Sequence, residues 1–289
     1  METEQSLRIG IQKSGRLTEK TIKLLEDIGL KFDNYKSSLM VKCLNMDIEL
    51  LLIRDDDIPE YVQDGVCDLG FVGANVTQER RANVTVIRDL EYGMCRLSLA
   101  APKNGSIKQP QDFDGKRIAT SYPNLTKDFF DKLGLTVHIV EISGAVEIAP
   151  TLNVSDAICD LVSTGSTLRA NGLVELDPIF YSQTQLIQTN KPISATKQDL
   201  INRILLRIQG RQLAEKSRYI MMNAPSSSVE EIKVILPSAK SPTILSLADP
   251  DMVAIHSVVP INQFWEIMER LKSVGACDMV VLPIESMVQ

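Results

Sequence analysis

A run of small hydroxyl residues after an apolar segment carries the clearest chemistry in this sequence. Residues 156–167 read DAICDLVSTGST, where the apolar part predicts a buried strand and the STGST part predicts a turn that opens a short helix. Such a corner presents backbone N–H groups and hydroxyls to an anion, typically a phosphate. Asp156 and Asp160 could hold sugar hydroxyls or Mg²⁺. An ordinary turn between a strand and a helix is the alternative interpretation, because hydroxyl-rich turns are common.

A second corner of the same kind lies near the start of the chain. Alternating apolar residues at 7–11 predict a strand, and Gln12-Lys13-Ser14-Gly15-Arg16 predicts the turn after it. Thr18 is the expected cap of the next helix, and Gly29 its expected end. Lys13 and Arg16 would supply positive charge to a phosphate. A surface turn with solvated cations remains possible.

The elements that must position these corners are those of two α/β lobes. Apolar runs in the first lobe predict strands, and the acids Asp55, Asp56 and Asp57 precede a helix that Pro59 opens. Gly70 and Gly73 would permit close approach by backbone or ligand. We place a boundary near residues 97–102, after which the same pattern repeats. The predicted strands are 7–11, 48–53, 68–73, 84–87 and 95–101, then 117–120, 135–142 and 156–162.

Three strand ends in the second lobe carry hydroxyl or glycine clusters. These are Thr120-Ser121, Ser143-Gly144 and residues 163–167, and a short helix is expected at 145–147. In an open parallel sheet, ligands bind at the carboxyl ends of the strands. The convergence favours a phosphate site more than any single cluster does.

The remainder of the chain predicts a return to the first lobe and then a separate module. A strand at 179–188 leads into a long helix, which makes a two-lobed clamp with a cleft. From residue 218 onward the order β-α-β-β-α-β is the ferredoxin-like pattern, with a capping box at 227–230. The predicted domains are residues 1–98 with 180–216, residues 99–179, and residues 217–289.

Composition excludes several classes of protein. The 289 residues are 44% hydrophobic and 24% charged, which is typical of a globular protein, and 31 basic against 37 acidic residues give a net charge of −6. Without a basic run, nucleic acid is not an expected partner. The five dispersed cysteines indicate reduced thiols. We expect a cytoplasmic protein, because no signal peptide or membrane span is recognisable.

The common catalytic signatures are absent from the sequence. Neither His138 nor His256 has a partner at the spacing of a nucleophilic triad. Cysteine and histidine spacings that indicate a transition-metal site do not occur, nor does a P-loop or a G-x-G-x-x-G fingerprint. What remains is the positioning of phosphates and a sugar, with Mg²⁺ bound mainly through the ligand.

Taken together, the motifs closely resemble those of ATP phosphoribosyltransferase in its long form, the first enzyme of histidine biosynthesis. The resemblance spans nearly the whole chain. It rests on QKSGRL at 12–17, RDDDIP at 54–59, CRLSLA at 95–100, GKRIATSYPN at 115–124, DAICDLVSTGSTLRANGL at 156–173, RIQG at 207–210, YIMM at 219–222 and VLPIE at 281–285.

The resemblance implies a reaction and a fold. ATP and phosphoribosyl pyrophosphate would give N1-(5-phosphoribosyl)-ATP and pyrophosphate with Mg²⁺. The fold would be two periplasmic-binding-protein-like lobes and a ferredoxin-like third domain. The family forms dimers and hexamers and is inhibited by histidine through the third domain, and AMP is a further expected ligand.

The resemblance also assigns residues. Ser163, Thr164, Gly165, Ser166 and Thr167 would hold the 5-phosphate, and Glu147 and Asp156 would lie near the ribose or the magnesium as catalytic residues. Asp160 would then be structural. The ATP side would be lined by Ser14, Gly15, Arg16, Arg54, Asp55, Gly73 and Tyr92. Histidine would bind near Asn223, Thr243 and Ala276, where some relatives have an acid in place of Asn223.

The expected mechanism is a loose displacement at the anomeric carbon by adenine N1, which carries a lone pair and no proton. Rate would come from alignment and charge neutralisation. Replacing Asp156 by Asn would lower turnover without unfolding the protein. A non-catalytic two-lobed binding protein with a sensor domain is the alternative, and pyrophosphate release distinguishes the two.

Overall fold

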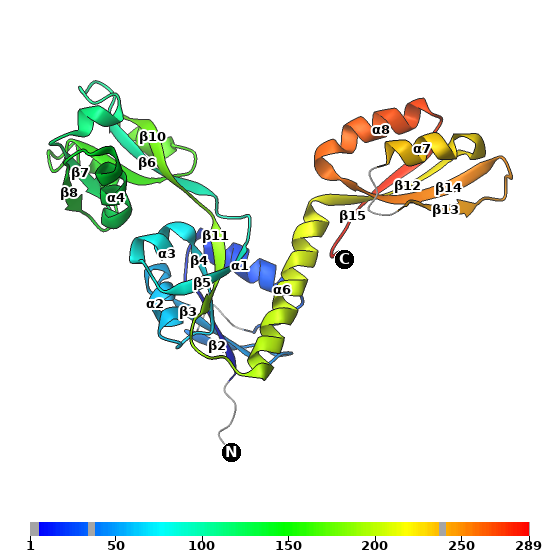
Figure 1. Ribbon diagram of the computed structural model, residues 1–289, viewed down its shortest axis with the longest axis horizontal. Helices are drawn as coiled ribbons and strands as arrows, with labels where there is room; N and C mark the ends of the chain where they lie inside the picture. The colour runs from blue at the N-terminus through cyan, green and yellow to red at the C-terminus, as the bar shows by residue number, and fades with distance from the viewer. Residues whose placement is uncertain (1–5, 34–37, 237–240, 289) are drawn as a thin grey trace, which may run out of the picture. The chain divides into compact units, whose positions relative to one another are not determined.

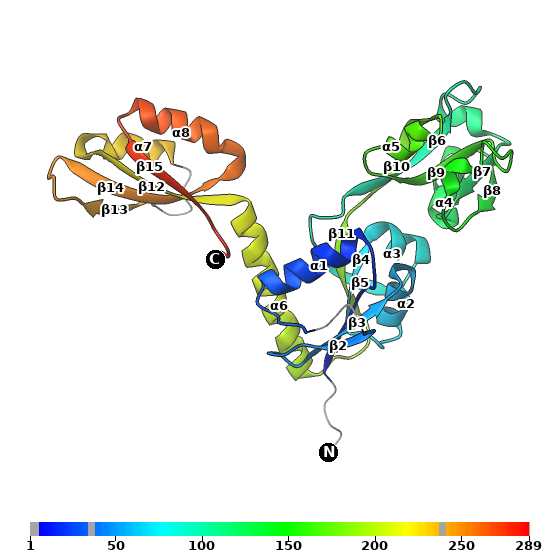
Figure 2. The ribbon, with the colours of Figure 1, turned by 180° about the vertical axis from the view of Figure 1, so that it is seen from behind.

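The computed structural model describes residues 6–33, 38–236 and 241–288. The chain forms two compact units, Met1–Glu26 with Leu30–Lys197, and Asp27–Gly29 with Gln198–Gln289. Most elements of each unit are labelled in Figure 1, and β9 and α5 are labelled in Figure 2. Within the described residues, no helix combines the length and the apolar character needed to span a membrane.

The first sheet of the first unit has six strands in the order β2-β3-β1-β4-β11-β5. β1 pairs in parallel with β3 and β4, as expected of strands joined by helices. Their apolar residues, such as Ile9, Leu50 and Leu69, are fully buried. The elements are β1 (Leu7–Gln12), α1 (Arg16–Asp27), β2 (Met40–Lys42), β3 (Ile48–Ile53), α2 (Ile58–Gln63), β4 (Leu69–Gly73), α3 (Ala74–Arg80) and β5 (Val84–Asp89).

One helix start in this sheet was predicted wrongly. α1 begins at Arg16, two residues before Thr18, so Thr18 is not its cap. The Thr18 hydroxyl instead donates to the carbonyl oxygen of Gln12 at 2.9 Å, which ties the helix to the end of β1.

The second sheet has five strands in the order β10-β6-β9-β7-β8. β9 and β8 both pair with β7 in parallel, whereas β6 runs antiparallel to β9 and to β10. The elements are β6 (Cys95–Pro102), β7 (Arg117–Thr120), α4 (Pro123–Leu133), β8 (His138–Glu141), β9 (Ala157–Val162), α5 (Ser166–Ala170) and β10 (Leu173–Ser182).

The chain returns from the second sheet to the first in one extended segment. The single strand predicted at 179–188 is two strands, β10 and β11 (Thr184–Thr189), which are separated at Gln183. β10 pairs with β6 in the second sheet, and β11 lies between β4 and β5 in the first. Periodicity does not reveal this division, because both halves read as extended and apolar.

The second unit contains α6 (Ala195–Glu215) from Gln198 onward and a four-stranded antiparallel sheet in the order β13-β14-β12-β15. Two helices cover the sheet, and Ile220, Ile232, Ile255 and Leu271 form its core. The predicted capping box is wrong, because Ser228 makes no side-chain cap hydrogen bond. The elements are β12 (Ser217–Pro225), α7 (Val229–Ile235), β13 (Thr243–Ser246), β14 (Met252–Pro260), α8 (Phe264–Ser273) and β15 (Cys277–Pro283).

The predicted fold class is confirmed. Two α/β sheets share the first unit, and the β-α-β-β-α-β order of the second unit is ferredoxin-like. The unit boundary at residue 198 lies earlier in the chain than the predicted regulatory domain at 217, since α6 groups with the C-terminal sheet.

Candidate functional site

The residues 163–167, which we call the anion loop, lie at an edge of the second sheet where three strands end. β7, β8 and β9 are parallel, so their carboxyl ends meet at one edge, as Figure 2 shows from behind. Ser121 Oγ donates to the carbonyl oxygen of Ile142 at 2.6 Å and joins the ends of β7 and β8. The predicted convergence of the three clusters is confirmed.

The anion loop exposes the groups that an anion would need. Ser163, Thr164, Ser166 and Thr167 are exposed, and Gly165 bends the chain with a φ of 70°. Thr164 Oγ1 lies 3.1 Å from Ser166 Oγ. α5 begins at Ser166 rather than near Leu168 and has only five residues. The capacity to bind an anion therefore lies in the loop amides and hydroxyls more than in a helix dipole.

A pocket of about 140 Å³ opens beside the anion loop. All five loop residues line it, together with two carboxylates, Glu147 and Asp160. Glu147 lies on a 3-10 helix at Val146–Ile148, and Asp160 lies on β9. The pocket thus pairs donors for an anion with acids for hydroxyls or a cation.

Asp160 is the most strongly perturbed acid of this pocket. Burial, with a further contribution from the charge of Glu147, raises the pKa of Asp160 to about 6. The backbone N–H of Leu161 donates to Asp160 Oδ1 at 2.7 Å and opposes this shift. An acid whose charge is disfavoured by burial and by a neighbouring carboxylate suits a cation or a hydroxyl-rich ligand.

The predicted placement of Asp156 beside the anion loop is wrong. Asp156 precedes β9, whereas the loop follows it, and six strand residues span about 20 Å. Arg117 binds the Asp156 carboxylate through Nη2 at 2.9 Å and through its backbone N–H at 2.8 Å. This partner lowers the pKa of Asp156. The carboxylate at the loop is Asp160, which the sequence interpretation had treated as structural.

A larger pocket of about 550 Å³ lies next to the loop pocket, and we call it the cleft. Leu161 and Ser163 line both. The remaining lining comes from both sheets of the first unit, with Lys20 as its cation. The cleft is lined by Gln12, Leu17, Glu19, Lys20, Asp55, Gly73, Asn75, Val76, Gly93, Met94, Cys95, Tyr122, Leu161 and Ser163.

Of the residues predicted for the ATP side, the structure brings two into the cleft, Asp55 and Gly73. Burial and the neighbouring Asp56 raise the pKa of Asp55. Ser14, Gly15 and Arg54 are exposed and lie outside the lining. The side chain of Arg16 lies outside the described part of the structure.

Tyr92 also does not line the cleft. Its hydroxyl lies 2.7 Å from Thr21 Oγ1 on α1, and burial raises the pKa of Tyr92 to about 12. The residue supports the wall formed by the next two residues, Gly93 and Met94.

Sequence reasoning missed a polar network in the cleft. Asn75 is buried, and its Nδ2 donates to the Tyr122 hydroxyl at 3.1 Å. Ser182 Oγ donates to Asn75 Oδ1 at 2.7 Å. Asn75 follows Gly73 at the carboxyl end of β4, so the position of a polar residue after a buried strand was the available signal.

The three residues predicted to bind histidine lie in the second unit. Asn223 is on β12 beside Cys277 of β15, next to buried Ala276. Asn223 Nδ2 donates to the Asp278 carboxylate at 3.2 Å. Thr243 lies on edge strand β13, which is separated from β12 by β14. Within one chain, Asn223 and Ala276 are neighbours and Thr243 is not.

Metal binding fits the loop pocket only as a shared site. Among the described residues, no group of three or more His, Cys, Asp or Glu side chains could hold an ion. Glu147 and Asp160 supply two carboxylates, which is the number that Mg²⁺ takes when phosphate oxygens and water complete its shell. Thiolate ligands do not contribute, since the buried Cys159 has a raised pKa of about 12.

Comparisons with known proteins indicate the same family as the sequence motifs do. Residues 54–210 match the family model HisG, described as ATP phosphoribosyltransferase, and residues 214–286 match the HisG C-terminal domain. A chain of the ATP phosphoribosyl transferase (HisG:HisZ) complex from Thermotoga maritima is similar, with 31% identity and a TM-score of 0.60. The match covers 70% of this chain and 98% of that one.

Binding proteins of transport systems also resemble the chain at low identity. The substrate binding protein of an amino acid ABC transporter is 14% identical, with a TM-score of 0.49, over 72% of this chain and 94% of that one. A truncated arginine-bound ArgBP from T. maritima is 14% identical, with a TM-score of 0.46, over 70% of this chain and 94% of that one.

Proposed function

Because this chain belongs to the ATP phosphoribosyltransferase family, an enzyme family of histidine biosynthesis, we propose that it transfers the 5-phosphoribosyl group of phosphoribosyl pyrophosphate to N1 of ATP. The observation that carries the proposal is the adjacency of the loop pocket and the cleft, which share Leu161 and Ser163. Two ligands can thus meet at the end of β9, as a transfer between two phosphorylated substrates requires.

The anion loop is the proposed site of the 5-phosphate. Its exposed hydroxyls and backbone N–H groups match a dianionic phosphate, and the net charge of the chain, −6, offers no other attraction. The ribose would then extend toward Glu147 and Asp160, whose carboxylates accept hydrogen bonds from its hydroxyls. Asp160 thereby replaces Asp156 in the proposed site.

The cleft is the proposed site of ATP. Lys20 supplies positive charge for its phosphates, and Asp55, Gly73 and the Asn75–Tyr122 pair line the space for the rest of the nucleotide. Ser14, Gly15, Arg16 and Arg54 remain predicted contacts of the phosphates at the rim. Tyr92 is proposed as a support of this wall.

The proposed chemistry needs alignment rather than proton transfer. The lone pair of adenine N1 forms a bond to the anomeric carbon, and the bond to pyrophosphate breaks with its electrons on the departing oxygen. Glu147 and Asp160 would face the positive charge that develops on the ribose ring and lower its energy. Mg²⁺, when bound by these carboxylates together with the substrate, would neutralise the leaving pyrophosphate.

Regulation by histidine is proposed for the second unit. Asn223 and Ala276 would contact the amino acid, and the Asp278 carboxylate, which accepts a hydrogen bond from Asn223, would hold its ammonium. Thr243 would contribute only if the ligand spans the sheet or a second subunit is present. Dimers or hexamers and binding of AMP are parts of the same proposal.

The test is release of pyrophosphate when the protein is incubated with ATP, phosphoribosyl pyrophosphate and MgCl₂. Release should require both substrates and yield phosphoribosyl-ATP by mass spectrometry. Histidine should reduce the rate, and its failure to do so would remove only the regulatory proposal. Folded protein that releases no pyrophosphate would instead support a binding protein.

A matched pair of glycine variants tests the anion loop itself. Gly165 and Gly115 have φ angles of 70° and 68°, so replacing either with Ala strains the backbone alike. A Cβ at Gly115 meets nothing within 4 Å, whereas one at Gly165 lies 3.1 Å from Arg169 Nη1. We expect Gly165→Ala to lower kcat/KM for phosphoribosyl pyrophosphate and Gly115→Ala to leave it within about twofold.

A further inference from the structure

Two guanidinium groups hold successive carbonyl oxygens of the anion loop. Arg96 Nη1 donates to the carbonyl of Ser163 at 3.2 Å, and Arg169 Nη1 donates to the carbonyl of Thr164 at 3.2 Å. Arg96 can reach the loop because β6 is antiparallel to β9, which places Arg96 opposite Val162. The two arginines come from different elements and act on adjacent peptide groups.

Arg96 is itself fixed in place. Glu175 on β10 accepts hydrogen bonds from Arg96 Nε at 2.5 Å and Nη2 at 2.6 Å. Ser98 Oγ donates to the same carboxylate at 2.8 Å. A planar guanidinium held by two parallel bonds has little rotational freedom. The carbonyl oxygen of Ser163 therefore accepts a hydrogen bond from a donor, Arg96, whose position is fixed.

The direction of each carbonyl sets the direction of the next N–H. In a trans peptide group the C=O and N–H bonds point to opposite sides. Fixing the carbonyls of Ser163 and Thr164 thus turns the N–H groups of Thr164 and Gly165 the other way. Neither N–H donates a hydrogen bond to any residue in the part of the chain that the structure describes.

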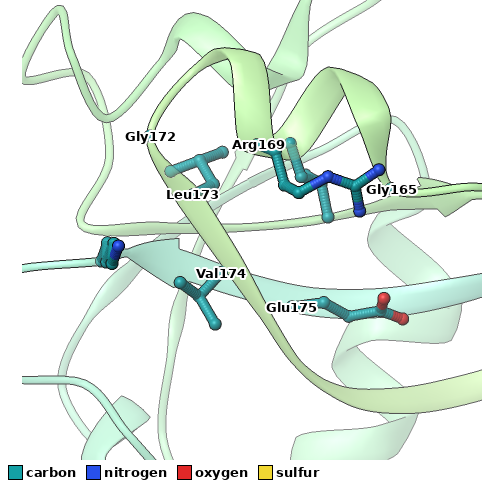
Figure 3. A pocket seen from close by; sticks show the side chains of 8 residues that line it. Gly165, Arg169, Gly172, Leu173, Val174 and Glu175 are labelled. Carbon is teal, nitrogen blue, oxygen red and sulfur yellow. The ribbon is translucent and has the colours of Figure 1, made fainter.

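Arg169 and the two acids line different pockets at the loop. Arg169 and Glu175 line a cavity of about 520 Å³, and Figure 3 shows the Arg169 side chain reaching from α5 toward Gly165. Glu147 and Asp160 line the loop pocket, which shares Gly165 and Leu168 with this cavity but receives no contribution from Arg169. Thr164 and Gly165 both line the loop pocket, and their N–H groups point away from the carbonyls that the arginines hold.

We propose that Arg96 and Arg169 are positioning residues that aim the N–H groups of Thr164 and Gly165 at the substrate phosphate. The inference rests on the proposed function, in which the anion loop holds the 5-phosphate. A loop held ready in this way loses less entropy when the phosphate binds. Loss of one charged anchor should weaken phosphate binding about tenfold.

Arg169 provides the sharper test, because its side chain is exposed and borders a cavity with apolar walls at Leu168 and Leu173. Arg169→Met keeps a long stem there and removes only the donor. Arg169→Lys restores a donor and the charge. Lys127→Met is the matched control, since Lys127 is an exposed cation on α4 that pairs with Asp131 on the same helix.

The readouts are the dissociation constant of ribose 5-phosphate by calorimetry, the KM of each substrate, and kcat. We expect Arg169→Met to raise the dissociation constant of ribose 5-phosphate and the KM of phosphoribosyl pyrophosphate about tenfold. The KM of ATP and kcat should stay within about twofold, and Arg169→Lys should recover most of the loss. Arg96→Lys, which is too short to reach both Glu175 and the loop, should show the same selective rise if the Met variant does not fold.

Unchanged binding of ribose 5-phosphate in both arginine variants would overturn the proposal, as would equal losses for both substrates. These outcomes differ from a failure of the proposed function. If the wild-type chain binds ribose 5-phosphate but releases no pyrophosphate, the transferase proposal fails while the effect of Arg169 on binding is still measured.

Discussion

Two aspartates, one just before β9 and one toward its carboxyl end, have opposite electrostatic surroundings. At the amino end, Asp156 is bound by Arg117, and its pKa is lowered. Toward the carboxyl end, Asp160 is partly buried near Glu147, has no cationic partner among the described residues, and has a raised pKa of about 6. Arg117 pairs with one carboxylate, and the other would be available to a ligand in the proposed site.

We propose that this difference separates a structural acid from a functional one. A paired carboxylate stabilises the fold and has no spare capacity to bind substrate. An unpaired and partly buried one costs stability and is retained where a ligand completes its environment. The two acids should therefore respond to substitution in opposite ways, in activity and in stability.

The largest expected effect is a loss of activity when Asp160, toward the carboxyl end of β9, is replaced. Asp160→Asn keeps the shape of the side chain and removes its charge from the proposed ribose site. We expect kcat/KM for phosphoribosyl pyrophosphate to fall about 100-fold, the usual effect of removing a group that faces transition-state charge. Steady-state pyrophosphate release measures it, with Asp156→Asn as the control on the same strand. Equal losses of kcat/KM in the two variants would show that Asp160 and Asp156 do not differ in function.

The pH dependence of kcat/KM should also reveal the ionisation of Asp160. If Asp160 acts as the carboxylate, wild-type kcat/KM should rise with pH up to about 6, where this group loses its proton, and level off above it. Below that value we expect a fall of about tenfold per pH unit. The profile of Asp160→Asn should lack this step. A step that persists in the variant would assign it to another group.

Stability should change in the direction opposite to activity at Asp160. The unfolded chain ionises this group at the ordinary value of 3.8, and the folded chain only at about 6. Folding therefore holds the proton more tightly, and stability falls as pH rises from 3.8 to about 6. Removing the charge should raise the free energy of unfolding at pH 7.5 by up to about 3 kcal/mol. Denaturant unfolding of both proteins at pH 7.5 and pH 4 measures this, and the difference should shrink at pH 4.

The smallest effect is expected at the amino end. Asp156→Asn removes a half-exposed ion pair, so the free energy of unfolding at pH 7 should fall by less than about 1 kcal/mol. The lowered pKa means that this contribution is present above 3.8 and is lost as the pH falls below it. Activity should stay within about twofold. A large loss of turnover in this variant would reinstate Asp156 at the site.

Local patterns in the sequence were sufficient for the anion loop and for most of the elements around it. Strands of buried apolar residues and the STGST turn depend on neighbours in the chain, and the loop lies at the predicted sheet edge. The division of β10 from β11 at Gln183 could not be predicted, because an extended apolar segment does not indicate which sheet it will join. The contact of Asn75 with Tyr122 in the cleft could not be predicted either, because the two residues are 47 positions apart in the sequence.

The sequence by itself determined that a phosphate-compatible loop follows a buried strand, that three such ends belong to parallel strands of one sheet, and that a ferredoxin-like module follows the two lobes. Only the tertiary structure decided which acid lies beside the loop. Asp156 and Asp160 are both acids of the same strand segment, and nothing in their spacing reveals that Arg117 binds one and that burial near Glu147 isolates the other. The pairing of a charge depends on what the fold brings within about 4 Å, and residues distant in sequence supply it.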